Sequence, residues 1–226
     1  MSNSQRCKPF NLELYAVTDQ AWCEGISLAD KVEQAILGGA TIIQLREKLS
    51  STRAFVQLAQ SIKRITDSYQ VPLIINDRLD IALAVDADGL HIGQQDMPVP
   101  MARKLLGKGK ILGVSAATIP AARQAEAEGA DYIGVGALFP TDTKTDADLV
   151  TFRELRHIVR SVSIPVVGIG GINSSNILSL QGSGLSGVAV VSAIFAQQEV
   201  RAATRNIKRL TEVLLKDADA GESGNL

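Results

Sequence analysis

Eight short apolar runs alternate with longer amphipathic segments along the chain, and this alternation restricts the fold more than any other feature. Most of the runs are continuously apolar, which is typical of parallel strands covered on both faces. In the segments between them, apolar residues recur at three- and four-residue spacing, as in helices that pack on one side. We therefore expect eight parallel strands, at residues 13–18, 40–46, 72–76, 88–92, 111–115, 131–136, 165–170 and 187–192.

Eight strand–helix units in about 200 residues predict an α/β protein with a single (β/α)8 TIM barrel. The alternative is a doubly wound open sheet. A dinucleotide-binding sheet of that kind has a Gly-x-Gly-x-x-Gly turn after its first strand, whereas residues 17–25 read VTDQAWCEG. The chain also has no Gly-x-x-x-x-Gly-Lys-Ser/Thr loop. The barrel is therefore the favoured fold.

The pattern runs without a linker through residues 13–216, which we expect to form one catalytic domain. Residues 1–12 and 217–226 are mostly polar or small. Segments of that composition bury little apolar surface, so we predict a disordered tail at each end.

The charge and the cysteines exclude several classes of protein. The net charge is −1, which offers no basic field to nucleic acid or to an anionic membrane. No apolar run approaches the ~20 residues that span a bilayer, and the first residues lack a signal-peptide core. Neither of the two cysteines belongs to a Cys-x-x-Cys pair. We predict a cytoplasmic protein that binds small molecules, without a nucleic-acid or membrane partner, and the sequence leaves a homo-oligomer open.

Charged and amide side chains follow several of the predicted strands at their carboxyl ends, where a barrel carries its site. The run 72–76, PLIIN, for example, is followed directly by Asp77 and Arg78. Mg²⁺ is usually held by one or two carboxylates together with phosphate oxygens. Two aspartates and three cations at one rim therefore predict a site for a magnesium-bound polyphosphate. The residues are Gln44, Arg46, Lys48, Asn76, Asp77, Asp96, Ser115, Thr141, Thr143 and Lys144.

A second anion site is expected where the seventh and eighth strands end. Residues 168–171 read GIGG, and the last strand ends in Val191 and Ser192. Backbone N–H groups at this part of a barrel often bind phosphate. The pattern thus predicts two anionic groups in one site.

Each candidate also has a simpler structural interpretation. Asp77 and Asp96 are well placed to cap helices, and Arg46 with Lys48 could be a solvated pair in a loop. His91 lies inside a strand, so a packed or hydrogen-bonded core histidine is a better interpretation than a catalytic base.

Six motifs together resemble thiamine phosphate synthase, in their order and their separations. They are QLREK, PLIINDR, ADGLHIGQQD, GVSA, GADYIGVGALFPTDTK and VVGIGGI. The resemblance extends from about Leu14 to about Phe195. It implies a barrel transferase that joins 4-amino-2-methyl-5-hydroxymethylpyrimidine diphosphate to 4-methyl-5-(2-hydroxyethyl)thiazole phosphate, which gives thiamine phosphate and pyrophosphate.

The resemblance also implies roles for individual residues. One Mg²⁺ would bind Asp77 and Asp96. Catalytic roles would fall to Arg46, Lys48, Ser115 and Lys144. The pyrimidine diphosphate would contact Gln44, Leu45, Arg46, Glu47, Lys48, Asn76, Ser115 and Lys144. The thiazole phosphate would contact Thr141, Asp142, Thr143, Gly171, Val191 and Ser192.

The sequence departs from related sequences at Ala117, where they commonly have histidine. Two other functions remain as alternatives, a thiazole tautomerase of the same barrel family and a non-catalytic binding protein of the thiamine pathway. A tautomerase has no need of a metal-bound diphosphate. The presence of both Asp77 and Asp96 therefore favours the synthase.

Overall fold

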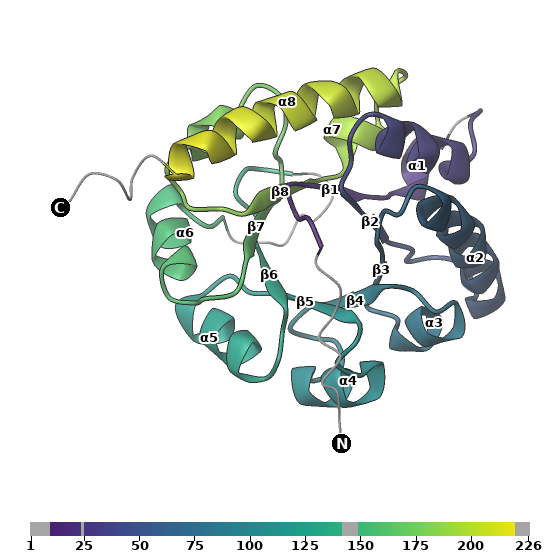
Figure 1. Cartoon of the computed structure of the whole chain (residues 1–226), viewed down its shortest axis with the longest axis horizontal. Coiled ribbons are helices and arrows are strands. Elements are labelled where there is room, and N and C mark those ends of the chain that lie inside the picture. The colour runs from purple at the N-terminus through teal and green to yellow at the C-terminus, as the bar shows by residue number, and fades with distance from the viewer. Residues whose placement is uncertain (1–9, 24, 142–148, 220–226) are drawn as a thin grey trace.

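A computed structural model of the chain describes residues 10–23, 25–141 and 149–219. Eight parallel strands close into a barrel in chain order, which confirms the predicted (β/α)8 fold (Figure 1). Every predicted strand is present. β5 has its predicted bounds, and the other strands are slightly shorter than predicted. The strands are β1 (Leu14–Val17), β2 (Ile42–Leu45), β3 (Leu73–Asn76), β4 (Gly89–Ile92), β5 (Ile111–Ser115), β6 (Tyr132–Val135), β7 (Val166–Ile169) and β8 (Gly187–Val190).

Helices surround the barrel on the outside (Figure 1). Between β7 and β8 the chain forms a single 3-10 helix instead of an α-helix. The helices are η1 (Gln20–Trp22), α1 (Leu28–Leu37), α2 (Thr52–Ser68), α3 (Leu79–Ala84), α4 (Val99–Leu106), α5 (Ile119–Ala127), α6 (Phe152–Val159), η2 (Ile177–Leu180), α7 (Ser192–Phe195) and α8 (Val200–Asp219). No helix in the described parts of the chain is both long and apolar enough to cross a membrane.

Hydroxyl side chains fix where several helices begin. Ser27, Ser51 and Thr118 each accept a hydrogen bond from a backbone N–H in the first turn of the following helix. Thr151 and Glu154 form a reciprocal capping box at the start of α6. Each cap satisfies N–H groups that have no partner within the helix, so the sequence sets the start of these crossovers locally.

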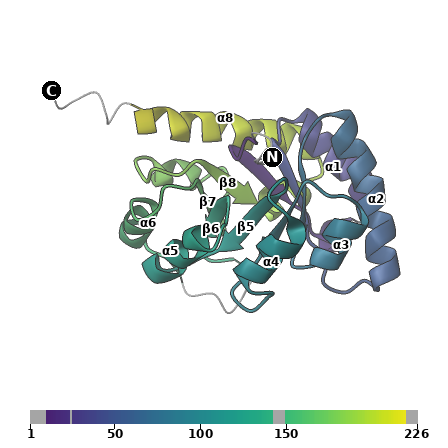
Figure 2. The ribbon, with the colours of Figure 1, turned by 60° about the horizontal axis from the view of Figure 1, so that its bottom comes forward.

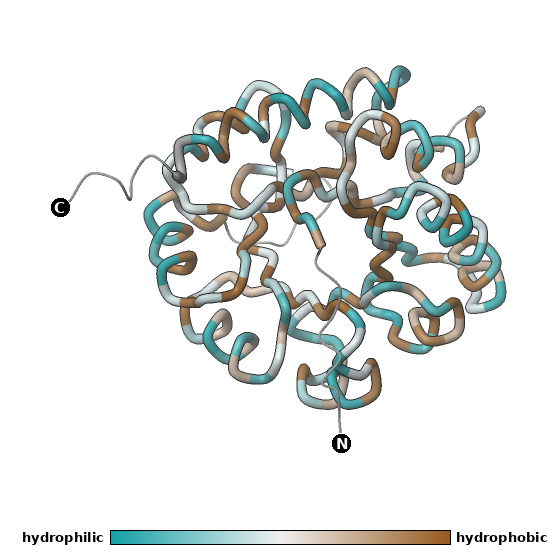
Figure 3. Tube along the Cα trace, in the orientation of Figure 1, coloured by the Kyte–Doolittle hydropathy of each residue, from teal (hydrophilic) through white to brown (hydrophobic). Residues whose placement is uncertain are grey.

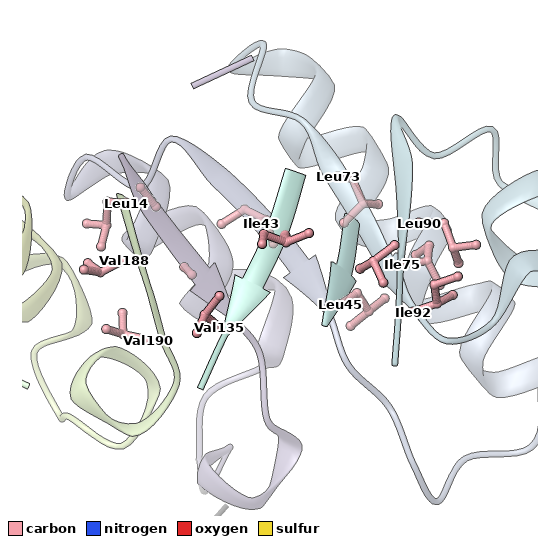
Figure 4. Close-up of a cluster of buried hydrophobic side chains, with 14 of the residues drawn as sticks. Leu14, Ile43, Leu45, Leu73, Ile75, Leu90, Ile92, Val135, Val188 and Val190 are labelled. Carbon is pink, nitrogen blue, oxygen red and sulfur yellow. The ribbon is translucent and has the colours of Figure 1, made fainter. Parts of the chain in front are cut away.

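The main apolar core lies between the strands and the helices. Outward-facing strand residues such as Leu14, Ile43 and Leu73 are fully buried there, and Figure 4 shows them along neighbouring strands. Apolar residues follow the strands and the inner sides of the helices (Figure 3). Burying each such side chain stabilises the fold by about 1.5–3 kcal/mol before entropy is counted.

A second, smaller cluster fills the inside of the barrel. Tyr15, Ile42, Ile74 and Tyr132 belong to it and are almost completely buried. Successive strand residues face opposite sides of the sheet. On each strand, therefore, every second residue points into the barrel, and the last of these lies at the carboxyl end of the interior. This alternation decides which strand-end side chains reach the site.

Both predicted domain boundaries need correction. Leu12 is buried and Phe10 packs beside it against the inner cluster, although both were assigned to the N-terminal tail. The helix α8 continues to Asp219, past the predicted boundary at residue 216, and lies across one side of the barrel (Figure 2). The composition of a mostly polar segment did not predict this packing, because only a few apolar side chains are needed to close the end of a barrel. The rest of each predicted tail lies outside the described residues.

Candidate active site

A cavity of about 160 Å³ lies at the carboxyl end of the barrel strands. Its walls include apolar residues from β1, β7 and β8, among them Val17, Ile169 and Ala189. Polar residues from several different strands and loops complete it, so groups that are far apart in the sequence meet around one space. The predicted site residues that line it are Gln44, Arg46, Asn76, Ser115, Thr141, Gly171, Val191 and Ser192.

The end of β2 brings only part of the predicted QLREK motif to the cavity. Leu45 lies between Gln44 and Arg46, faces outward and is fully buried in the main core. The carboxylate of Glu47 accepts hydrogen bonds from its own loop, from the backbone N–H groups of Leu49 at 3.0 Å and Ser50 at 3.3 Å. Neither residue lines the cavity, because strand alternation turns the Leu45 side chain away from it and the Glu47 side chain supports its loop. Their contact with substrate stays a prediction.

Lys48, Asp77 and Asp96 gather beside the cavity. The ammonium group of Lys48 forms an ion pair with Asp77, while the carboxyl groups of Asp77 and Asp96 are close enough to interact with each other. Burial raises the pKa of the Asp96 carboxyl, a hydrogen bond from the backbone N–H of Gly93 opposes this, and the Asp77 carboxylate raises the pKa further. Two carboxylates from neighbouring strand ends thus share one small region with Lys48.

Neither carboxylate caps a helix. The N-cap positions of α3 and α4 are Arg78 and Pro98, and neither makes a side-chain capping hydrogen bond. Asp77 instead has a positive φ of 62°, and Asp96 accepts a 2.7 Å hydrogen bond from the N–H of Gly93. The simpler interpretation of these aspartates as caps is wrong.

Backbone geometry shapes the opposite wall of the cavity. Gly170 and Gly171 follow β7 with φ values of 94° and 66°. A Cβ on Gly171 would lie 2.5 Å from the carbonyl oxygen of Pro140, in the loop after β6. The side-chain amide of Asn176 donates a 2.9 Å hydrogen bond to the Gly171 carbonyl oxygen. Only glycine allows this close approach, and the asparagine holds the peptide in one orientation.

A family model described as thiamine monophosphate synthase matches residues 14–194 of the chain. The thiamine-phosphate synthase of Ruminiclostridium cellulolyticum is 54% identical over 205 residues, which cover 91% of this chain and 96% of that relative. The one from Alkaliphilus oremlandii is 54% identical over 195 residues, with 86% and 93% coverage. The chain belongs to the thiamine monophosphate synthase family. This confirms the resemblance on which the sequence motifs were interpreted.

A solved structure from the same family has the same fold. Thiamine phosphate pyrophosphorylase from Pyrococcus furiosus superposes with a TM-score of 0.84 at 39% identity, and the match covers 90% of this chain and 97% of that chain. The thiamine phosphate pyrophosphorylase from Bacteroides thetaiotaomicron, at 16% identity and a TM-score of 0.67, shares the fold.

For a thiamine monophosphate synthase, the donor set beside the cavity fits one magnesium ion. Asp77 and Asp96 offer hard carboxylate oxygens, and their mutual repulsion favours a cation between or beside them. Among the described residues there is no larger cluster of three or more His, Cys, Asp or Glu side chains that could hold a metal. A two-carboxylate site suits Mg²⁺ because phosphate oxygens and water complete its ligands.

Three predicted substrate contacts, Asp142, Thr143 and Lys144, lie outside the described residues. Thr141, which precedes them, is at the cavity. Ala117, where related sequences commonly have histidine, is exposed just before the N-cap of α5. It is not one of the cavity-lining residues.

The strand ends alone did not reveal a chain of hydrogen bonds in the wall of the cavity. Gln44 Nε2 donates to the Tyr15 hydroxyl at 2.8 Å, and that hydroxyl lies 2.8 Å from the hydroxyl of Tyr132. Tyr132 Oη lies 2.9 Å from His91 Nδ1, and His91 Nε2 lies 3.0 Å from Ser115 Oγ. The prediction of a hydrogen-bonded histidine is confirmed, and His91 lines the cavity together with Tyr15 and Tyr132. The signal that could have identified the tyrosines is their inward strand position.

Proposed function

We propose that the chain catalyses the condensation of 4-amino-2-methyl-5-hydroxymethylpyrimidine diphosphate with 4-methyl-5-(2-hydroxyethyl)thiazole phosphate, and releases thiamine phosphate and pyrophosphate. One observation supports this most strongly. The cavity that contains Gln44, Asn76 and Ser115 adjoins the carboxylates of Asp77 and Asp96. A pocket with neutral polar side chains and Arg46, beside a pair of carboxylates, suits a substrate with an uncharged ring and a metal-bound diphosphate.

The diphosphate lies, in this proposal, across the ends of β2 to β5. Arg46 and Lys48 place positive charge at this rim, and Asn76 and Ser115 offer neutral hydrogen-bond donors. Lys144 adds a third cation from the loop after β6. Donors aimed at a leaving group stabilise the negative charge that grows on it as its bond breaks.

One Mg²⁺ completes the site, held by Asp77 and Asp96. When bound, this ion supplies further positive charge to the departing diphosphate. The ion pair of Lys48 with Asp77 keeps the lysine at the same rim. The apolar walls at Val17, Ile169 and Ala189 keep water from the reacting carbon.

The thiazole phosphate occupies the opposite side of the cavity. Gly171, Val191 and Ser192 line it at the ends of β7 and β8, and they bind the phosphate largely through backbone N–H groups. Thr141, with Asp142 and Thr143, contacts the same substrate. Two anchored anions hold the thiazole nitrogen near the methylene carbon of the pyrimidine, which removes an entropic cost of several kcal/mol.

The electron-rich aminopyrimidine ring can delocalise positive charge at this methylene carbon, so the diphosphate departs before the thiazole nitrogen attacks. No side chain needs to form a covalent bond to substrate. The protein's part is to neutralise the leaving group and to align the two substrates.

Pyrophosphate release tests the function directly. The purified chain should release pyrophosphate with both substrates and Mg²⁺, and only background amounts with either substrate alone. A tautomerase would change the thiazole phosphate without releasing pyrophosphate. A binding protein would retain both substrates unchanged. Either of these last two results would contradict the proposal.

A further inference from the structure

Five side chains form one continuous hydrogen-bonded chain inside the barrel, and both ends of this chain lie at the cavity. Gln44 is at one end and Ser115 at the other, with Tyr15, Tyr132 and His91 between them. We propose that Tyr15, Tyr132 and His91 are positioning residues that give this chain a single direction, from the Gln44 amide to the Ser115 hydroxyl. The inference rests on the function proposed above, because that function assigns ligands to the two ends.

The direction follows from counting donors and acceptors. Gln44 Nε2 donates to the Tyr15 hydroxyl. If this hydroxyl also accepted from Tyr132, its own buried hydrogen would have no acceptor among its partners Gln44 and Tyr132, so we assign the Tyr15 hydrogen to Tyr132. The Tyr132 hydroxyl hydrogen then goes to His91 Nδ1, which must accept. A neutral imidazole that accepts at Nδ1 carries its hydrogen on Nε2, and that hydrogen is donated to Ser115 Oγ. The Ser115 hydroxyl hydrogen therefore remains available to a ligand.

The surroundings keep the two tyrosines as neutral phenols. Burial raises the pKa of both hydroxyls above the ordinary range, so each has one hydrogen to donate. The Tyr132 ring is held against Phe10, Tyr15 and His91, with ring centroids 6.1, 5.9 and 5.5 Å away. Rigid packing of this kind leaves the hydroxyls little choice of partner.

A glycine makes room for the centre of the chain. A Cβ on Gly113 in β5 would lie 2.1 Å from Tyr132 Cζ and 2.5 Å from His91 Nδ1. Because Gly113 has no side chain, Tyr132 and His91 can meet across the strand that lies between them.

A fixed direction prepares both ends for the proposed substrate. At one end Ser115 presents a hydrogen, which an anionic diphosphate oxygen accepts. At the other end Gln44 uses Nε2 on Tyr15 and presents Oε1, which accepts from an amino group on the pyrimidine. The reverse direction would present an acceptor to the diphosphate and a donor to the amino group. One internal network thus selects the polarity of both ligand contacts.

The tautomer of His91 tests the proposal in the ligand-free protein. The chain has only two histidines, so ¹⁵N NMR of the wild type and of His157→Gln assigns the His91 signals. At about pH 8, where an ordinary histidine is neutral, we expect the hydrogen on Nε2 and a hydrogen-bonded lone pair on Nδ1. A hydrogen on Nδ1 would overturn the proposal.

The Gln44→Glu variant tests the direction of the chain more strictly, because an ionised carboxylate only accepts hydrogen bonds. Tyr15 must then donate to residue 44, the whole chain reverses, and His91 should carry its hydrogen on Nδ1. The pH is raised until the ¹³C signal of residue 44 shows an ionised carboxylate. In the double variant with Tyr132→Phe, where the chain is cut, the hydrogen should return to Nε2. An unchanged tautomer in the single variant would overturn the proposal.

Affinity for inorganic pyrophosphate with Mg²⁺ gives a third readout. Gln44→Glu should bind pyrophosphate about fivefold more weakly than the double variant with Tyr132→Phe, roughly the value of one net hydrogen bond, because only the single variant turns the Ser115 hydrogen toward His91. Tyr69→Phe added to Gln44→Glu is the matched control, because Tyr69 donates to Glu33 on the outside of the barrel. Equal affinity in all three proteins would overturn the proposed effect on Ser115. If pyrophosphate fails to bind the wild type, the assigned function fails, while the tautomer experiment still decides the direction of the chain.

Discussion

The backbone N–H of Asp77 donates a 2.8 Å hydrogen bond to the carbonyl oxygen of His91. This bond joins the carboxylate pair at the rim to β4, the strand that carries the half-buried His91. It also holds Asp77 in its left-handed conformation, with φ at 62°. The proposed metal site and the interior of the barrel are therefore positioned by the same two strand ends.

Asp77→Asn should reduce turnover far more than stability. Asparagine tolerates a positive φ at least as well as aspartate, so the backbone should keep its conformation. Loss of one metal-binding carboxylate should lower kcat by about 10²–10³-fold. Steady-state pyrophosphate release and thermal denaturation measure the two effects.

Asp80→Asn is the control for Asp77→Asn. Asp80 lies nearby in α3, is exposed and pairs with Arg78, so its loss should leave turnover nearly unchanged. Equal turnover of Asp77→Asn and the wild type would remove Asp77 from the metal site.

Gly171→Ala should damage the thiazole phosphate site. A Cβ there would meet the carbonyl oxygens of Pro140 and Phe139 at 2.5 and 2.7 Å, so the loops after β6 and β7 would have to separate. We expect KM for the thiazole phosphate to rise about 10–100-fold, because small misplacements of binding groups have effects of this size.

Gly182→Ala provides a matched comparison. Gly182 also has a positive φ, of 72°, but a Cβ there meets nothing within 4 Å. Both variants bear the backbone cost of about 1–2 kcal/mol, whereas only Gly171→Ala adds the clash. Similar KM values in the two variants would show that the close approach to Pro140 has no part in binding.

Gly113→Ala should destabilise the barrel by about 1–3 kcal/mol, the usual cost of overpacking a core. Its Cβ would overlap the Tyr132 ring. Gly109→Ala, at an open turn where a Cβ meets nothing within 4 Å, should change stability by less than about 1 kcal/mol. Denaturant unfolding of both variants makes the comparison, and equal unfolding free energies would contradict the packing described here.

Removal of metal with EDTA should abolish pyrophosphate release, and added Mg²⁺ should restore it. The carboxylate pair lies at the rim and outside the two buried apolar clusters. We therefore expect EDTA to leave the fold intact, which circular dichroism would check. Wild-type turnover in EDTA would show that the magnesium assignment is wrong.

The sequence predicted the strands well because parallel barrel strands are buried on both sides and read as continuous apolar runs. It also predicted most of the polar side chains that line the cavity, because the carboxyl ends of parallel strands meet at one end of a barrel. The structure brings Gln44 and Ser115 together in this way although β2 and β5 are far apart in the sequence.

Other features depended on information beyond the strand ends. Tyr15 and Tyr132 lie deeper in the interior, so a search limited to strand termini missed them. Leu45 was predicted as a substrate contact because it belongs to the QLREK motif. It lies between the inward-facing Gln44 and Arg46, so strand alternation places its side chain in the outer core. Phe10 and Leu12 fill the bottom of the barrel, which a short polar segment does not reveal by composition.

A crystal structure of the chain with Mg²⁺ and pyrophosphate would test the central claim most directly. We predict one ion bound to the carboxylates of both Asp77 and Asp96, with pyrophosphate oxygens on the same ion and within hydrogen-bond distance of Ser115. An ion bound elsewhere, or pyrophosphate bound away from the cavity between Gln44 and Ser115, would contradict it.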